Sequence, residues 1–327
     1  MVNTRQRKAE EPSRVHSNLG SKFNTQFQTG ATENMSQLSI VYGLAAFAAI
    51  VIAWRAVFWY REGQKLQKDG YLPPHPTFFG QWLLRLISKI MTRLFVGPVK
   101  VIGRENATAF KGRIHILPNH QFPLDFMVVG KSLPYGFRHL GTAGQMAGGF
   151  RGTLAAFAGF FAVKTEAGKA TEKGGGEKAV HSMALALARH KKSRVLTFAQ
   201  GKLVGDNVLR PEEFRTGVIR ANQAAIQEHG VSPDDLAVLP MAIHYMRDPR
   251  QATWMHRLIV KMGWRSFRTF RMFGETTRNY GAVVAIGKPI KMSQLPADPR
   301  EAIEVVRRAI EGQLTEARVW ANTRLES

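Results

Sequence analysis

Residues 114–129 read IHILPNHQFPLDFMVV and predict a buried strand, a loop and the start of a helix. The apolar run ends at Pro-Asn-His, and Asp125 follows His120 by five positions, behind Pro123. In one continuous helix that step would turn the two side chains to different faces, so they can meet only across a bend. Pro123 supplies a bend, because proline lacks an N–H and is favoured in the first helical turn.

This bend would let Asp125 fold back onto the imidazole of His120. A carboxylate held there fixes the ring tautomer and stabilises its charged form, which makes the histidine a general base for a hydroxyl. A His/Asp pair at this spacing also arises by chance roughly 0.2 times in a chain of this composition, and the alternative is a structural histidine. The rest of the sequence has to decide between the two interpretations.

Composition restricts the class of protein. The chain has 327 residues, enough for one large α/β domain with appendages. It has no cysteine, which excludes disulfides, cysteine-ligated zinc and thiol catalysis. Its formal net charge of +22 requires an acidic partner, either nucleic acid or an anionic membrane surface.

The N-terminal part of the chain predicts a membrane anchor. Residues 1–36 are polar and predict a disordered tail. Residues 37–60 are mostly apolar and predict a transmembrane or membrane-inserted helix, because the 23 residues from Leu38 to Tyr60 reach about 34 Å as a helix. The alternatives are a buried core helix and a secretory signal, although a signal normally lacks so long a polar leader.

The charges beside this helix predict its orientation. The amino side carries Lys22, whereas the carboxyl side carries Arg61, Lys65 and Lys68. By the positive-inside rule the rest of the chain lies on the cytoplasmic side of the membrane.

Residues 61–97 predict a linker followed by a basic amphipathic helix. Arg85, Lys89 and Arg93 recur every four residues and form one stripe, with apolar residues on the rest of the helix surface. Such a helix suits the lipid headgroup layer, and the alternative is a solvated helix packed on a soluble core.

Residues 98–327 predict one α/β domain, because apolar strand patterns and helical patterns alternate along them. Within this domain, basic and aromatic residues interleave over residues 247–278. That composition fits single-stranded nucleic acid or a lipid headgroup layer. The upstream apolar helix favours the membrane, so anionic lipids are the expected partner and no nucleic acid is expected.

Segments in this domain resemble, in order, the motifs of the glycerolipid acyltransferase family typified by lysophosphatidate acyltransferase. Asn119, His120 and Asp125 match its first motif, which is Asn-His, four residues and Asp. Residues 159–164 resemble the second motif, with Lys164 where arginine is usual.

The third motif of the family, Pro-Glu-Gly-Thr, corresponds here to Ala-Gln-Gly-Lys at residues 199–202, so Gly201 matches. Residues 214–217 then resemble the Phe-x-x-Gly that follows it. Residues 236–243, which contain Pro240, resemble the fourth motif, a buried strand with Val-Pro and apolar residues.

The resemblance implies an α/β domain with a mixed sheet flanked by helices, and a membrane-bound O-acyltransferase. It further implies transfer of an acyl chain from acyl-CoA or acyl-ACP to a lysophospholipid hydroxyl, with lysophosphatidate as acceptor, and requires no metal or other cofactor. His120 and Asp125 would be catalytic. The substrate-binding residues would be Asn119, Lys164, Gln200, Gly201, Lys202 and Pro240, with Asn119 and backbone amides at the helix start as guesses for stabilising the oxyanion.

Gln200 marks a departure from the family pattern. Glutamine keeps an acceptor oxygen and adds donors, but it lacks the negative charge of the usual glutamate. One alternative is therefore the same chemistry on a different lysolipid or hydroxyl acceptor. Another is a non-catalytic membrane or nucleic-acid binding protein on the same fold.

Overall fold

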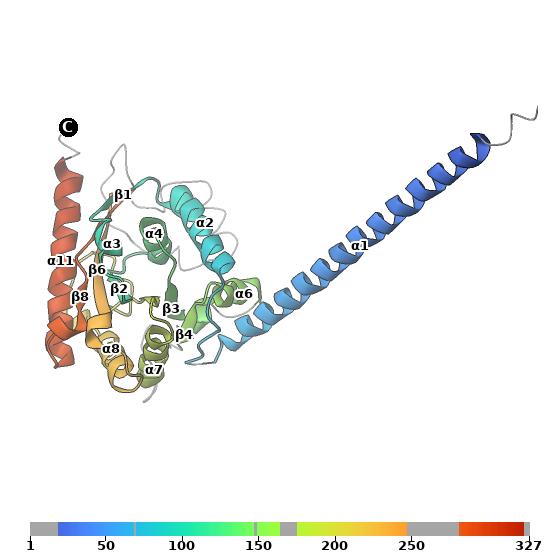
Figure 1. Cartoon of the computed structure of the whole chain (residues 1–327). Helices are drawn as coiled ribbons and strands as arrows, with labels where there is room; N and C mark the ends of the chain where they lie inside the picture. Colours follow the sequence, from blue (N-terminus) through green and yellow to red (C-terminus); the bar gives the residue numbers. More distant parts are fainter. Residues whose placement is uncertain (1–18, 69, 147–148, 164–174, 247–280, 324–327) are drawn as a thin grey trace, which may run out of the picture. The chain divides into compact units, whose positions relative to one another are not determined.

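The computed structural model describes residues 19–68, 70–146, 149–163, 175–246 and 281–323 (Figure 1). The chain divides into two compact units, Met1–Phe58 and Trp59–Ser327. Lys164 and the basic-aromatic segment 247–278 lie outside the described residues.

Helix α1, Leu19–Lys65, differs from the predicted boundaries. It begins at Leu19, whereas the sequence predicts a disordered tail up to residue 36. Once the apolar segment is helical, each residue added to its end gains a hydrogen bond without a new nucleation step, so polar residues can extend it. Within α1, Ile40–Lys65 contains an 18-residue window with a mean hydropathy of 2.0 and is long enough to cross a membrane. This helix indicates membrane association.

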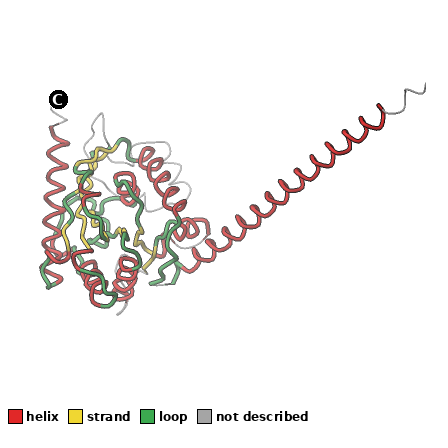
Figure 2. Tube along the Cα trace, viewed as in Figure 1, coloured by secondary structure: helices red, strands yellow, loops and turns green. Residues whose placement is uncertain are grey.

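A mixed sheet forms the centre of the second unit (Figure 2). In the described residues it has eight strands, and seven lie in the order β1-β7-β6-β2-β5-β3-β4 while β8 pairs with β6. Strands β7 and β8 run antiparallel to β6, and all other pairs are parallel. The strands are β1 Val99–Ile102, β2 Arg113–Pro118, β3 Arg138–Thr142, β4 Phe161–Val163, β5 Arg194–Leu196, β6 Leu236–Tyr245, β7 Ala282–Ile286 and β8 Ile290–Lys291.

Helices cover both faces of this sheet (Figure 1). The α-helices are α2 Phe78–Phe95, α3 Asn106–Ala109, α4 Asp125–Ser132, α5 Ala143–Met146, α6 Gly149–Phe157, α7 Gly175–Ala188, α8 Gly217–Gln227 and α11 Pro299–Thr323. Short 3-10 turns are η1 Pro211–Glu213, η2 Pro233–Asp235 and η4 Met292–Gln294. The predicted α/β class with a mixed sheet flanked by helices is confirmed.

Two hydrophobic clusters result from the alternation of side chains along the strands. In β2, Ile114 and Ile116 belong to the cluster that includes residues of α2 and α4. Leu117 points to the other face and belongs to the cluster formed with α7, α8 and α11. Because both faces are covered, β2 and β6 are buried along most of their length, which is why they read as nearly continuous apolar runs.

Helix α2 follows the N-cap Thr77, whose side chain accepts a hydrogen bond from the Gly80 amide at 3.0 Å. Its buried face carries small and polar residues such as Gly80, Ser88 and Thr92. A side chain at Gly80 would clash with the Phe157 carbonyl, so this glycine permits close packing on α6. The outer face exposes large apolar side chains, namely Phe78, Phe79, Trp82, Leu86 and Ile90.

Two predicted elements differ in their bounds. The sequence pattern predicts a helix over residues 146–157, whereas α6 begins at Gly149 and a separate helix, α5, ends at Met146. The pattern also predicts a strand from Tyr135, whereas β3 begins at Arg138. Pro134 has no N–H to donate and Gly136 weakens strands, so regular pairing begins only after them.

Candidate active site

The candidate active site lies where three parallel strands end at the same edge of the sheet. β2 pairs in parallel with both β5 and β6, so their carboxyl ends lie together. Ligands of α/β proteins characteristically bind at this edge. Each of the three strand ends contributes to the site: Asn119 and His120 follow β2, Phe198 and Gln200 follow β5, and Tyr245 ends β6.

His120 and Asp125 meet as the bend at Pro123 predicts. Asp125 is the first residue of α4, and its amide donates to the Phe122 carbonyl across the bend at 2.9 Å. The distance from His120 Nδ1 to Asp125 Oδ2 is 2.9 Å. The carboxylate is an acceptor, so Nδ1 carries the proton and Nε2 is left as the basic nitrogen.

Asp125 is fully buried and collects four hydrogen-bond donors. Its Oδ2 also accepts the amides of Gln121 at 2.6 Å and Phe122 at 2.9 Å. Its Oδ1 accepts the hydroxyl of Tyr245. A buried carboxylate is tolerated when donors surround it, and the helix N-terminus adds favourable electrostatics. The donors thus fix this side chain in one orientation.

The Tyr245 hydroxyl remains a donor over the whole working pH range. Burial and the nearby Asp125 carboxylate raise the pKa of this phenol well above its ordinary value. Its ring packs edge-on against Phe122, with the ring centroids 6.1 Å apart. Tyr245 therefore supports the dyad from a strand that lies 120 residues further along the chain.

The backbone and the ring of His120 are both held in place. Its amide donates to Gln200 Oε1 at 2.9 Å, and its carbonyl accepts from the Val204 amide at 2.8 Å. The imidazole stacks on Phe198, with the centroids 3.8 Å apart and 11° between the planes. The side chain is 18% exposed, and none of the residues in the described ranges bonds its Nε2. The basic nitrogen is thus accessible.

Asn119 anchors the loop. Its Nδ2 donates to Asn207 Oδ1 at 2.7 Å and to the Ile243 carbonyl at 3.0 Å, and its Oδ1 accepts the Ile243 amide at 2.7 Å. The side chain is buried. These bonds occupy both amide hydrogens, so the structure gives no support to the guess that Asn119 donates to an oxyanion.

Gln200 lies directly behind His120. It is 2% exposed and buried beside the dyad loop. Because its Oε1 accepts the His120 amide, Nε2 carries the two hydrogens, and this buried nitrogen has no partner among the described residues. Gly201 follows with a φ of +63°, a conformation that side chains disfavour, and its amide donates to the Phe198 carbonyl at 3.0 Å.

Cationic side chains border this loop. Lys202 is half exposed and pairs with Glu213 Oε1 at 2.9 Å. The Arg215 amide donates to the Ala199 carbonyl at 2.8 Å, which brings this arginine beside Gly201. Its guanidinium is exposed and makes no ion pair within the described residues. Lys164, the other predicted cation, lies outside them.

Pro240 does not lie at the strand ends. It is buried in β6 opposite Leu117, and its carbonyl accepts the Gly287 amide at 2.9 Å. Later residues of the same strand, such as Tyr245, reach the site. A contact between Pro240 and substrate stays a prediction.

Sequence reasoning did not single out Phe198, Arg215 or Tyr245 as site residues. Phe198 and Arg215 lie inside or beside recognised motifs, so their position was the available signal. Tyr245 has no local signal, because its contact with Asp125 arises from sheet topology alone.

Comparisons with known proteins give a family match and a structural likeness. Residues 98–244 match the family model described as acyltransferase. The name of the matched family denotes transfer of an acyl group from a donor to an acceptor. A solved structure of the 1-acyl-sn-glycerophosphate (LPA) acyltransferase PlsC from Thermotoga maritima is similar to the chain, with a TM-score of 0.47 and 15% sequence identity. The alignment covers 83% of this chain and 97% of that one. No curated protein sequence matches the chain.

Proposed function

We propose that this protein is a membrane-bound O-acyltransferase that moves an acyl chain from a thioester of CoA or acyl carrier protein to a lysophospholipid hydroxyl. The proposed acceptor is lysophosphatidate, which would give phosphatidate. One observation carries the proposal: an acyltransferase-family domain holds a His120–Asp125 dyad, with its basic nitrogen accessible, at the carboxyl edge of its parallel strands.

In this mechanism His120 acts as the general base. Its Nε2 removes the proton from the acceptor hydroxyl as the oxygen attacks the thioester carbonyl. Asp125 keeps the proton on Nδ1 and stabilises the imidazolium that forms. When the tetrahedral intermediate collapses, the C–S bond breaks and the departing sulfur takes the proton from Nε2. The acyl chain passes directly to the acceptor, so no acyl-enzyme forms.

The oxyanion needs a donor other than the amides at the start of α4. Those of Gln121 and Phe122 are bound to Asp125. The Nε2 of Gln200 is a buried donor without a partner in the described structure, and it lies next to the His120 backbone. We assign to it a hydrogen bond to substrate, either at the oxyanion or at the acceptor, and we assign to Asn119 the positioning of the loop.

Cations near Gly201 are the proposed contacts for the acceptor phosphate. Arg215 offers a fork of donors that suits phosphate, and Lys202 offers a point charge. The Lys202–Glu213 pair is exposed on the lysine side, where such pairs contribute about 0–1 kcal/mol, so a phosphate can displace it readily. Lys164 is a further proposed phosphate contact on the strength of its motif.

Two helices are the proposed membrane contacts of the protein. The apolar part of α1 would anchor the chain. The outer face of α2, which includes Phe78, Trp82 and Ile90, would enter the lipid headgroup layer, with Lys89 and Arg93 at its exposed border. We further propose that the domain lies on the cytoplasmic side, because Arg61, Lys65 and Lys68 follow the apolar part of α1. Protease protection in sealed vesicles tests that side, and a C-terminal domain shielded from added protease would contradict it.

A different acceptor is the second candidate, and Gln200 is the observation that favours it. A glutamate there would retain the bond to the His120 amide but present an anionic oxygen where Gln200 presents an N–H₂ group. Gln200→Glu should therefore change the acceptor preference while leaving the use of the donor intact. An unchanged ranking of acceptors in this variant would contradict a role for Gln200 in selecting the acceptor.

The proposed function is tested by offering acyl-CoA and acyl-ACP to the detergent-solubilised protein with a panel of lysolipids. The panel should include lysophosphatidate and lysolipids with neutral or cationic headgroups. Preferred transfer to lysophosphatidate supports the proposal, and preferred transfer to another member supports the second candidate. Intact-mass analysis during turnover checks the direct route, because an accumulating acylated protein would refute it.

A further inference from the structure

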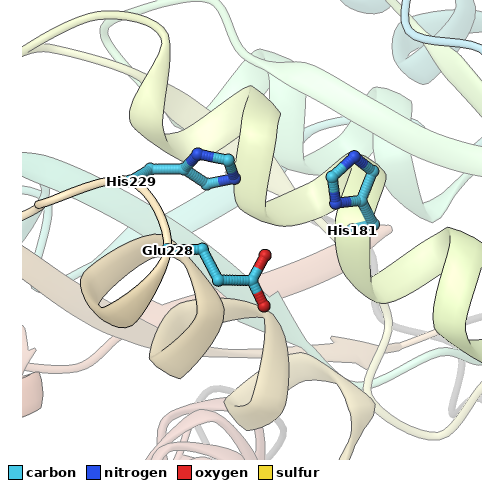
Figure 3. Close-up of side chains that lie close together, drawn as sticks. All are labelled: His181, Glu228 and His229. Carbon is cyan, nitrogen blue, oxygen red and sulfur yellow. The ribbon is translucent and has the colours of Figure 1, made fainter.

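Three side chains that commonly bind metals converge away from the active site, between α7 and the end of α8. His181 lies on α7, Glu228 is the C-cap of α8, and His229 follows it. One ligand atom from each residue, an imidazole nitrogen or a carboxylate oxygen, lies within 4.8 Å of the other two. Figure 3 shows the three groups turned toward the same space.

We propose that His181, Glu228 and His229 form a binding site for a divalent transition metal such as Zn²⁺. Two imidazoles and a carboxylate suit Zn²⁺, Co²⁺ or Ni²⁺, whereas Mg²⁺ and Ca²⁺ prefer oxygen ligands only. Zinc–nitrogen bonds of about 2.0–2.1 Å place tetrahedral ligands about 3.3 Å apart. The ligand atoms, which lie up to 4.8 Å apart here, come closer by side-chain rotation, because His181 and Glu228 are exposed and able to rotate. Water would occupy the fourth position.

The local electrostatics favour a cation at this point. The last turn of α8 leaves carbonyl groups without helical partners, and its dipole makes this end negative. An acidic residue at the C-cap, Glu228, adds to that negative charge and is unfavourable by itself. A bound metal ion would turn this repulsion into attraction.

The backbone holds the two consecutive ligands in place. The Glu228 amide donates to the Ala224 carbonyl at 2.9 Å, which completes the helix. Gly230 then adopts a φ of +64°, and the Val231 amide donates back to the Ala225 carbonyl at 3.2 Å. The backbone of His229 is therefore held between these two points, and only side chains need to move.

An unpaired nitrogen gives independent support. The Nε2 of His229 is buried and has no hydrogen-bond partner in the part of the chain that the structure describes. A buried polar atom without a partner is costly, and a metal ion would satisfy it. The rings of His229 and His181 are 6.2 Å apart, and His181 also lines a surface hollow of about 300 Å³, so solvent ions reach it.

The proposed ion stabilises the fold and takes no part in acyl transfer. Helix α8 has 11 residues and is about 16 Å long. The metal ligands lie at its C-terminal end, whereas the loop containing Gly201 and Arg215 leads to its N-terminal end. The ion would join α7 to α8. Because the ligands come together only in the folded chain, binding raises the stability.

The test uses the full chain, purified in detergent without a polyhistidine tag and stripped of metal with a chelator. Co²⁺ is titrated while its visible absorption and the thermal unfolding of the protein are recorded. We expect the absorption to saturate at one equivalent and Tm to rise by several degrees, whereas Mg²⁺ changes neither. Absence of both signals with Co²⁺ would overturn the proposal.

Single variants assign the ligands. His181→Ala, Glu228→Gln and His229→Ala should each weaken Co²⁺ binding by at least roughly tenfold, because even groups that only orient metal ligands contribute that much. The matched control is His190→Ala, which removes an exposed histidine just beyond α7 and should bind as the wild type does. Wild-type affinity in all three ligand variants would refute the site. Acyl transfer is not measured, so the outcome is independent of the proposed function.

Discussion

Replacing Tyr245 by phenylalanine removes one hydroxyl from a fully buried bond to Asp125. The ring remains and keeps its packing against Phe122, so no large cavity forms. The carboxylate retains three donors, which are His120 Nδ1 and two backbone amides, and loses the fourth.

The size of the effect follows from this geometry. A buried hydrogen bond to a charged group contributes about 1.5–3 kcal/mol, so the free energy of unfolding should fall by roughly 2 kcal/mol. In a domain of this size that corresponds to a decrease in Tm of about 4–8 °C. Because Tyr245 touches Asp125 and not the substrate, we expect kcat to fall by about tenfold at an unchanged KM for the acceptor.

Tyr71→Phe is the matched control. Tyr71 also donates to a buried carboxylate, that of Glu62, which lies in another part of the same unit. This variant should lose stability but keep its kcat. Thermal unfolding and steady-state acyl transfer of the detergent-solubilised proteins provide both readouts. A folded Tyr245→Phe variant with wild-type kcat would show that Tyr245 does not position the dyad.

Three further predictions concern the dyad, the buried histidines and the loop after β5. Asp125→Asn should reduce kcat by roughly 10²-fold or more with little change in KM, because the amide preserves the shape of the side chain but not its charge. Steady-state kinetics measure both constants, and an unaltered kcat would contradict the prediction. Burial lowers the pKa of His115 to about 4 in the folded protein. As the pH is lowered from 6.5 to 4, the unfolded chain therefore binds a proton that the folded chain does not, and the free energy of unfolding falls by about 3 kcal/mol. Denaturant unfolding at pH 7 and pH 4 should show a smaller loss in His115→Gln, and equal losses would exclude His115 as the cause. In Gly201→Ala the methyl group has room, but the residue must keep a left-handed φ, which costs about 1–2 kcal/mol of stability. We expect this strain to lower Tm and to raise the KM for the acceptor, and an unchanged KM and Tm would contradict the expectation.

The local structure around the dyad could be predicted from the sequence. The sequence predicts a strand over Arg113–Pro118 and a helix from Leu124, and the structure has β2 with those bounds and α4 from Asp125. The agreement is close because the apolar run, the proline and the helix start are all short-range signals. The contact between His120 and Asp125 follows from the same bend. These features depend on residues close together in the chain.

Features that depend on the order of strands could not be predicted. Tyr245 reaches Asp125 only because β6 lies beside β2 in the sheet, and no spacing in the sequence encodes that adjacency. The same topology buries Pro240 between neighbouring strands, although its motif was recognised. Small residues such as Gly80 and Ser88 also lie on the buried face of α2, and their burial depends on neighbours far away in the chain.

The central claim is that His120 removes the proton from a lysolipid hydroxyl during acyl transfer. The most direct test is the rate of acyl transfer by the full-length protein and by His120→Ala, with Tm measured on the same samples. We expect the variant to remain folded with a Tm lowered by several degrees, because buried Asp125 loses one donor while the backbone bonds of residue 120 remain. Acyl transfer should fall at least roughly 10²-fold. A folded variant that transfers acyl chains at the wild-type rate would contradict the account.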